Sequence, residues 1–193
     1  MTRRTPNPRL RQKLGRGVAF GIGIVGGLIA FAPLTALLRG SAQGVLQWVV
    51  FWGLSWLAIL VHELGHAVVG KLLGMTILRF HVVPLEIRLR PWSFHLTRQV
   101  LGQDLGGAVV FARAPDISRW GRVLLSLAGP LANFASGGIL IALAYRAPGY
   151  APEIVASLIG ISLTYAIVNL VPFDTSDGAM ILEALRLGSA QAA

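Results

Sequence analysis

The amino-acid sequence predicts a mainly α-helical, polytopic membrane protein with about four transmembrane helices and a small amphipathic β-element at the cytoplasmic interface. The first observation is composition. Of 193 residues, 54% are hydrophobic and 13% are charged, whereas soluble domains carry about 25% charged residues. The second is a set of four uncharged stretches, each long enough to span hydrocarbon as a helix. The third is a central segment in which apolar and charged residues alternate as in a strand.

The four candidate spans divide the chain into a short tail and one membrane-embedded domain. We place the spans at about residues 17–38, 44–61 (continuing to 73), 123–145 and 154–173. Residues 1–16 form a basic tail, and residues 17–193 form the single domain. We expect Gly74 to end the second helix, because glycine commonly closes helices in a left-handed conformation.

The first span is rich in glycine. Gly17 and Gly21, and likewise Gly23 and Gly27, have the small-xxx-small spacing that lets helices approach closely. We expect both pairs to pack against another helix of the same chain. Association between two copies of the chain is the alternative.

The third and fourth spans contain residues that disturb ordinary helices. Pro130 removes a backbone donor within the third span, and Asn133 needs a hydrogen-bond partner in hydrocarbon. Packing between helices would account for Gly129, Pro130 and Asn133 without a functional role. Pro172 is expected to end the fourth span, and a short helix is expected over 179–187.

The segment over about residues 76–115 predicts a small sheet. Residues 85–90 alternate strictly between apolar and charged side chains, which is the period of a half-buried strand. The alternation resumes over 94–97, and 108–111 is a further short strand candidate. Its arginines would suit anionic lipid headgroups. An ordinary cytoplasmic loop is the alternative.

The basic residues are distributed unevenly around the spans. Fifteen of the 17 Lys and Arg residues lie before the first span, between the second and third, or after the fourth; Arg39 and Arg146 lie elsewhere. Basic residues favour the cytoplasmic side, so both termini and the central segment are expected in the cytoplasm. The excess of Arg over Lys fits a GC-rich bacterial genome, and the expected location is a bacterial inner membrane. This distribution also explains the net charge of +9, so no nucleic-acid partner is expected.

The sequence His62-Glu63-Leu64-Gly65-His66 follows directly on the uncharged stretch 40–61. A spacing of four places both imidazoles on one helix face, where they can bind one metal ion. Glu63 can then take a proton from a water that the metal activates. Ionisable residues against hydrocarbon are costly and therefore indicate function. A chance match is the alternative.

A catalytic zinc site needs a third protein ligand and an open position. The chain has no cysteine, so this ligand must be a histidine or a carboxylate. The end of the fourth span returns to the membrane depth of His62, and Asp174 and Asp177 lie there. From the residues, either carboxylate could complete the site.

These motifs resemble the site-2 protease family of intramembrane zinc metalloproteases. The resemblance covers about Val45 to Leu187 and rests on three elements: His62-Glu63-Leu64-Gly65-His66, Gly129-Pro130…Asn133, and Asn169…Pro172…Asp177-Gly178. It implies one Zn²⁺ per chain, held by His62, His66 and Asp177. It implies that Glu63 is the general base and acid. It further implies that Asn169 and Asn133 bind substrate or orient groups near the metal.

The resemblance also implies a function. This is regulated intramembrane proteolysis, in which a peptide bond in or near a transmembrane segment is hydrolysed at a cytoplasmic-side active site. The expected partners are a single-span membrane protein substrate and the lipid bilayer. A further option is association with other copies of the chain as a homo-oligomer. In this family the β-element is thought to present an edge strand to an unwound substrate. The chain looks like a minimal member without a PDZ-like or nucleotide-sensing domain.

Two other functions fit parts of the pattern. One is a catalytically silent family member that acts as a membrane binding partner, and the intact Glu63 argues against it. The other is a divalent metal transporter. Ligands at a single membrane depth argue against transport, because a transport path would place them across the membrane.

Overall fold

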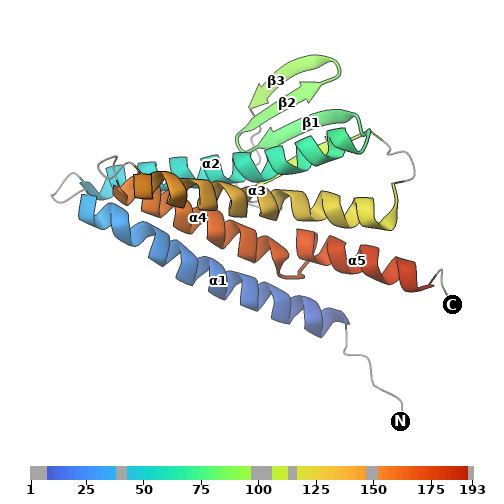
Figure 1. Cartoon of the computed structure of the whole chain (residues 1–193), viewed down its shortest axis with the longest axis horizontal. Coiled ribbons are helices and arrows are strands. Elements are labelled where there is room, and N and C mark those ends of the chain that lie inside the picture. The colour runs from blue at the N-terminus through green and yellow to red at the C-terminus, as the bar shows by residue number, and fades with distance from the viewer. Residues whose placement is uncertain (1–7, 38–42, 97–105, 113–116, 147–151, 191–193) are drawn as a thin grey trace, which may run out of the picture.

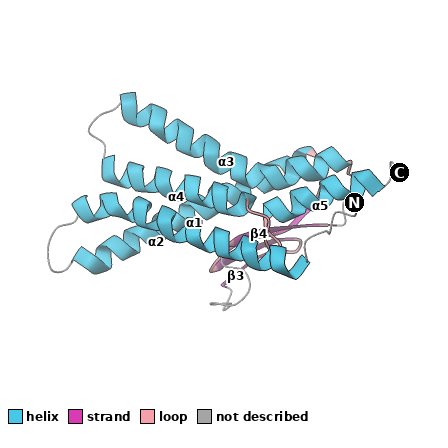
Figure 2. Cartoon of the chain, turned by 90° about the horizontal axis from the view of Figure 1, so that it is seen from below, coloured by secondary structure: helices cyan, strands magenta, loops and turns pink. Residues whose placement is uncertain are grey.

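The computed structural model describes residues 8–37, 43–96, 106–112, 117–146 and 152–190. In this part of the chain the helices lie side by side, and a four-stranded sheet leans outward from one flank (Figure 1). Figure 2 shows, after a quarter turn, that the sheet lies on one side of the helices. The predicted fold, mainly helical with a small β-element, is confirmed.

Four helices have the length and composition of membrane spans. They are α1 (Pro8–Leu37), α2 (Gln43–Leu72), α3 (Arg119–Arg146) and α4 (Pro152–Leu170). Each contains an apolar stretch long enough to cross a membrane, as predicted. Large apolar side chains point away from the protein, for example Phe20 (71% exposed) and Trp52 (67% exposed). Such outward apolar surface is expected where helices face lipid rather than water.

The helix bounds differ from those predicted. Helix α1 begins at Pro8, within the predicted basic tail, because proline fits a first helical turn and charged residues outside hydrocarbon do not stop a helix. Helix α2 ends at Leu72, and Gly74 has a φ of 80°, as expected for a left-handed C-terminal residue. Helix α4 ends at Leu170 rather than residue 173, because Pro172 disfavours helical geometry in the residue before it.

A fifth helix, α5 (Asp177–Ala190), is longer than the predicted segment 179–187. The hydroxyl of Ser176 accepts a hydrogen bond from the amide of Ala179 at 3.3 Å. This is the arrangement of a helix N-cap. It starts the helix at Asp177 and places that carboxylate in the first turn.

Helix α1 packs mainly on α4, but not through the predicted glycine pairs. A Cβ on Gly26 would lie 2.2 Å from the hydroxyl of Thr164, so the two helices are in close contact there. The glycines of the predicted pairs would place no Cβ within 4 Å of a described atom: Gly17, Gly21, Gly23 and Gly27. The predicted intramolecular packing of these pairs is therefore wrong. Their spacing predicted a close contact, but not which face of α1 turns inward.

The sheet consists of four antiparallel strands in the order β3-β2-β1-β4. They are β1 (Ile77–Val82), β2 (Leu85–Leu89), β3 (Trp92–Leu96) and β4 (Gly107–Phe111). The last three correspond to the predicted strands, although residues 97–105 and 113–116 lie outside the described residues. Strand β1 was not predicted. A register shift between Ile77 and Arg79 breaks its alternation, and such a bulge hides the period of two.

The two faces of the sheet differ in polarity. Phe80, Ile87 and Phe94 are directly paired across β1, β2 and β3, so they share one face. On the outer strand that face is open, because Trp92 is 67% exposed and Phe94 is 58% exposed. The outer hairpin therefore presents an aromatic surface, as the amphipathic pattern predicted.

The opposite face is polar and centres on Glu86. This carboxylate is buried and is paired across the strands with His81 and His95. Its Oε1 accepts a hydrogen bond from Arg88 Nε at 2.6 Å, and Arg79 lies 3.9 Å away. The hydrogen bond from Arg88, aided by the nearby positive charges, lowers the pKa of the Glu86 carboxyl.

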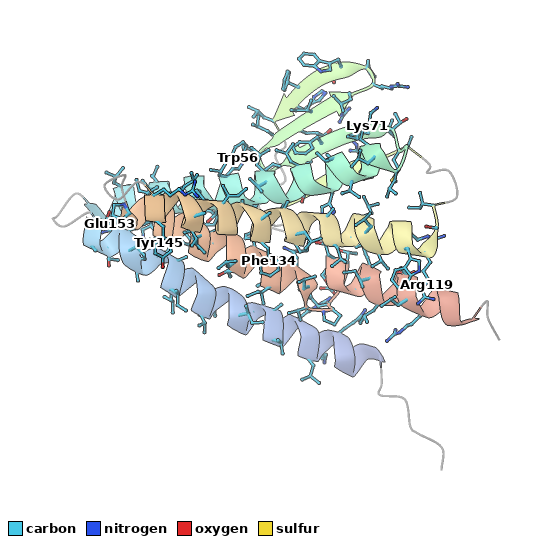
Figure 3. The ribbon with its side chains drawn as sticks, viewed as in Figure 1. Trp56, Lys71, Arg119, Phe134, Tyr145 and Glu153 are labelled. Carbon is cyan, nitrogen blue, oxygen red and sulfur yellow. The ribbon has the colours of Figure 1, made fainter. Side chains whose placement is uncertain are left out.

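The two ends of the helix bundle carry different elements. The sheet, Lys71, Arg119 and α5 lie toward one end, where α1 also begins (Figures 1 and 3). Tyr145 and Glu153 lie at the opposite end (Figure 3). The beginning of α1, the sheet and α5 thus share one end, as the charge asymmetry predicted. Which side of the membrane that end faces stays a prediction.

Candidate metal centre

Helix α2 continues without a break through the histidine motif. His62 and His66 are one turn apart and lie on the same face, with ring centroids 4.9 Å apart. His62 and Glu63 are buried, at 4% and 7% exposure. Burial of such polar groups is costly unless they have partners, so the surrounding elements decide what these side chains can do.

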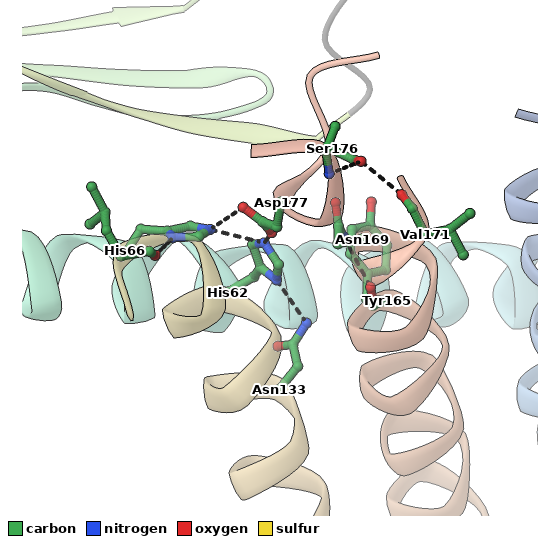
Figure 4. Close-up of polar contacts among 10 residues, drawn as sticks. His62, His66, Asn133, Tyr165, Asn169, Val171, Ser176 and Asp177 are labelled. Carbon is green, nitrogen blue, oxygen red and sulfur yellow. Dashed lines mark hydrogen bonds and ion pairs between the residues drawn. The ribbon is translucent and has the colours of Figure 1, made fainter. Parts of the chain in front are cut away.

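The third side chain is Asp177, at the start of α5. Its Oδ2 lies 3.0 Å from His62 Nε2, and its Oδ1 lies 3.4 Å from His66 Nε2 (Figure 4). The two Nε2 atoms lie 3.2 Å from each other. Burial acts to raise the pKa of Asp177, but its hydrogen bonds to the two histidines outweigh that effect and lower it. The carboxylate is thus the charged form that a metal ligand requires.

The geometry of these three donors fits a zinc ion. Bonds of about 2.0–2.1 Å in a tetrahedral site separate neighbouring ligand atoms by about 3.3 Å. The shortest separations between the three side chains are 3.0, 3.2 and 3.4 Å, and the two contacts of Asp177 use different carboxylate oxygens. One donor atom from each residue lies within 4.8 Å of the other two. Among the described residues, His62, His66 and Asp177 form the group of histidine and carboxylate side chains that can converge on one ion. The residue set predicted for the metal is therefore brought together, although its role as a ligand set stays a prediction.

Helix α3 provides the partners on the far side of both imidazoles. His66 Nδ1 lies 2.8 Å from the carbonyl oxygen of Leu125, to which an Nδ1–H donates. His62 Nδ1 lies 3.4 Å from the amide nitrogen of Asn133, a side chain with no exposed surface. The amide oxygen of Asn133 has no hydrogen-bond partner among the described residues. Such outer contacts fix the tautomer and orientation of metal-binding histidines.

Two glycines allow α3 to lie this close to α2. A Cβ on Gly65, inside the histidine motif, would lie 2.4 Å from the carbonyl oxygen of Ala128. A Cβ on Gly129 would lie 2.4 Å from Nε2 of both His62 and His66. The sequence allowed Gly129 to be read as an ordinary packing residue. The structure places it directly against the imidazoles, where a side chain would overlap the Nε2 atoms of both histidines.

Glu63 lies beside the first residue of β4. A Cβ on Gly107 would lie 2.4 Å from Glu63 Cγ, so the strand passes directly over this side chain. A cavity of about 300 Å³ is lined by Glu63, by the three candidate ligands and by Gly107–Val109. In the described sheet β4 is the outermost strand on this side. The cavity therefore places a carboxylate, a candidate metal site and the edge of a strand next to one another.

The remaining predicted residues lie at different distances from this centre. Asn169 lines the cavity, but its amide nitrogen donates to the carbonyl oxygen of Tyr165 at 3.0 Å rather than to a ligand. Asp174, the other candidate third ligand, points away and pairs with Arg16.

Two features of the site were not predicted from the sequence, the Leu125 carbonyl and Gly107. A backbone acceptor leaves no mark in the sequence, although the glycine pair at 106–107 could have indicated a close backbone approach.

The comparisons with known proteins agree with these motifs. The sequence profile of peptidase family M50 matches residues 50–152, more than half of the chain. A zinc metalloprotease of Methanocaldococcus jannaschii is 26% identical over 142 residues, which cover 72% of this chain. The chain spans about a third of that relative's length, at 34%. No solved structure gives a significant match. With its apolar helices this is an integral membrane protein, and it belongs to peptidase family M50.

Proposed function

We propose that this protein is a zinc-dependent intramembrane endopeptidase that hydrolyses a peptide bond in or near a transmembrane segment of another membrane protein. The observation that carries the proposal is the convergence of His62, His66 and Asp177 beside Glu63, at the end of apolar helices. Membership of peptidase family M50 and a relative named as a zinc metalloprotease support the same chemistry.

The residues divide the chemical work among them. When bound, zinc supplies Lewis-acid chemistry, which activates water and stabilises charge on the reacting carbonyl oxygen. Glu63 is not in the ligand group, so its carboxylate is available to take a proton from the attacking water and pass it to the leaving amine. His62 and His66 offer Nε2 to the metal, so each must carry its proton on Nδ1.

Asn133 is well placed to hold His62 in that form. A half-turn of its amide would turn the unpartnered oxygen toward His62 Nδ1–H, as an acceptor. The Leu125 carbonyl already provides the equivalent acceptor for His66. These contacts support the orienting role predicted for Asn133. For Asn169, which lines the cavity, contact with the substrate is the better-supported role.

The edge of β4 supports an extended substrate at this site. A helix in lipid hides its peptide bonds behind its own hydrogen bonds, so it must unwind before hydrolysis. An extended chain can add to a sheet edge through main-chain hydrogen bonds. Pairing along Gly107–Val109 would hold the unwound segment beside Glu63 and the zinc ligands.

We further propose that the site faces the cytoplasm, in a bacterial inner membrane. The support is the enrichment of Lys and Arg at one end of the bundle. Because the chain lacks cysteine, single introduced cysteines report the orientation. In intact cells an impermeant thiol reagent should label Arg146→Cys and spare His95→Cys. The opposite labelling pattern would reverse the orientation.

The activity is tested by Glu63→Gln. This substitution should keep the fold and the bound zinc, because Glu63 is not a ligand, and it should lower hydrolysis by about 10²–10⁴-fold. The assay is cleavage of a panel of single-span proteins by purified protein in lipid, with zinc content measured in parallel. Full complementation of a deletion strain by Glu63→Gln would instead indicate a binding partner.

A further inference from the structure

The turn between α4 and α5 determines where Asp177 lies. The hydroxyl of Ser176, the residue before Asp177, donates to the Val171 carbonyl at 2.7 Å and accepts from the Phe173 amide at 3.1 Å. The amide of Ser176 in turn donates to the carbonyl of Phe173 at 2.9 Å. Asp177 is therefore attached to a compact turn, and a movement of this turn moves the carboxylate.

Helix α1 contacts this turn from outside. Arg16 Nε lies 2.7 Å from Asp174 Oδ2, and Arg16 Nη2 lies 2.5 Å from Asp174 Oδ1, so the guanidinium binds the carboxylate with two parallel hydrogen bonds. Asp174 has a φ of 43°, in the left-handed region. A Cβ on Gly15 would lie 2.5 Å from the Pro172 carbonyl oxygen, so the helix backbone also touches the turn.

Helix α1 is itself held firmly along α4. A Cβ on Gly160 would lie 3.0 Å from the Cβ of Ala30, and Gly26 lies against Thr164. Ala30 and Ile161 are buried together in the same apolar cluster. The contacts at Gly15 and Arg16 are thus one end of a long, closely packed interface, which gives Arg16 a fixed base from which to hold Asp174.

We propose that Arg16 is a positioning residue for the metal centre. By binding Asp174, it holds the turn that carries Asp177 and slows release of the metal. None of the residues that line the described cavity comes from α1, so Arg16 acts through the turn rather than on the substrate. This inference rests on the proposed zinc site, and it assigns a role to α1, which lies outside the matched region 50–152.

The test measures zinc release from purified, full-length protein in lipid nanodiscs to an excess of a chromogenic chelator. Arg16→Ala and Asp174→Asn should each release zinc about two- to fivefold faster, the modest effect expected when an exposed ion pair is lost. Asparagine tolerates the left-handed conformation, so it removes the charge without straining the backbone. The double variant should be no faster than either single variant, and Arg16→Lys should be intermediate.

Lys13→Ala is the matched control, because it removes one positive charge from the same exposed end of α1 and should release zinc like the wild type. Arg16→Ala and Lys13→Ala with equal release rates would overturn the inference. So would a lower melting temperature for Arg16→Ala with unchanged release, because that pattern indicates a purely structural role. A wild-type protein that takes up no zinc would refute the proposed function itself, which separates the two failures.

Discussion

Replacing Gly129 by alanine should damage the metal centre more than the fold. The new Cβ would lie 2.4 Å from Nε2 of His62 and of His66, whereas ordinary contacts begin near 3.4 Å. The rings must therefore retreat by about 1 Å, and zinc sites tolerate changes of about 0.2 Å in ligand distance. Retreat is hindered because Leu125 and Asn133 hold the far sides of both rings.

The expected result is a loss of zinc affinity of at least tenfold, since disturbing the contacts that orient metal ligands typically costs about 10–100-fold. Helix propensity works in the opposite direction, because alanine is better than glycine within a helix by about 1 kcal/mol. Competition with a chelator of known affinity measures zinc binding, and circular dichroism with thermal unfolding monitors the helices of the metal-free protein.

Gly138→Ala is the matched control. It lies in the same helix, and its Cβ would meet no described atom within 4 Å. It should gain the same helix propensity and leave zinc binding unchanged. The reasoning fails if Gly129→Ala binds zinc as tightly as Gly138→Ala, because the metal would then not lie between the imidazoles that the Cβ approaches.

Further predictions concern the third ligand and the sheet. Asp177→Ala should lose most of its zinc in elemental analysis, whereas Asp174→Ala should retain a full complement; the reverse result would exchange their roles. Glu86 has a pKa below its usual 4.5 because Arg88 donates to it. Its stabilisation of the sheet is therefore present above about pH 4.5 and lost as pH falls through the lower, folded-state pKa. Protection of the β2 amides against hydrogen exchange, relative to their intrinsic rates, should fall as pH falls over that range in metal-free protein, and a profile identical to that of Glu86→Gln would contradict this account.

The glycines show most clearly what depends on tertiary structure. Spacing singled out the two pairs of the first span, yet α1 turns Gly26 rather than those pairs toward α4. A small-residue pattern tells how closely two helices can approach, but the partner and the face follow from the packing of the whole bundle. Gly129 shows the same limit, because its contact with both imidazoles depends on the position of α3 against α2.

The sequence by itself determined the class of the protein and two candidate ligands. Hydropathy specified the spans because hydrocarbon excludes charge, and helix geometry alone brought His62 and His66 to one face. The residues alone left Asp174 and Asp177 as equal candidates for the third metal ligand, and the resemblance to known proteases favoured Asp177. Tertiary structure separates these two carboxylates physically. Ser176 caps α5 so that Asp177 points at the histidines, while the left-handed Asp174 turns outward to Arg16, 158 residues away along the chain.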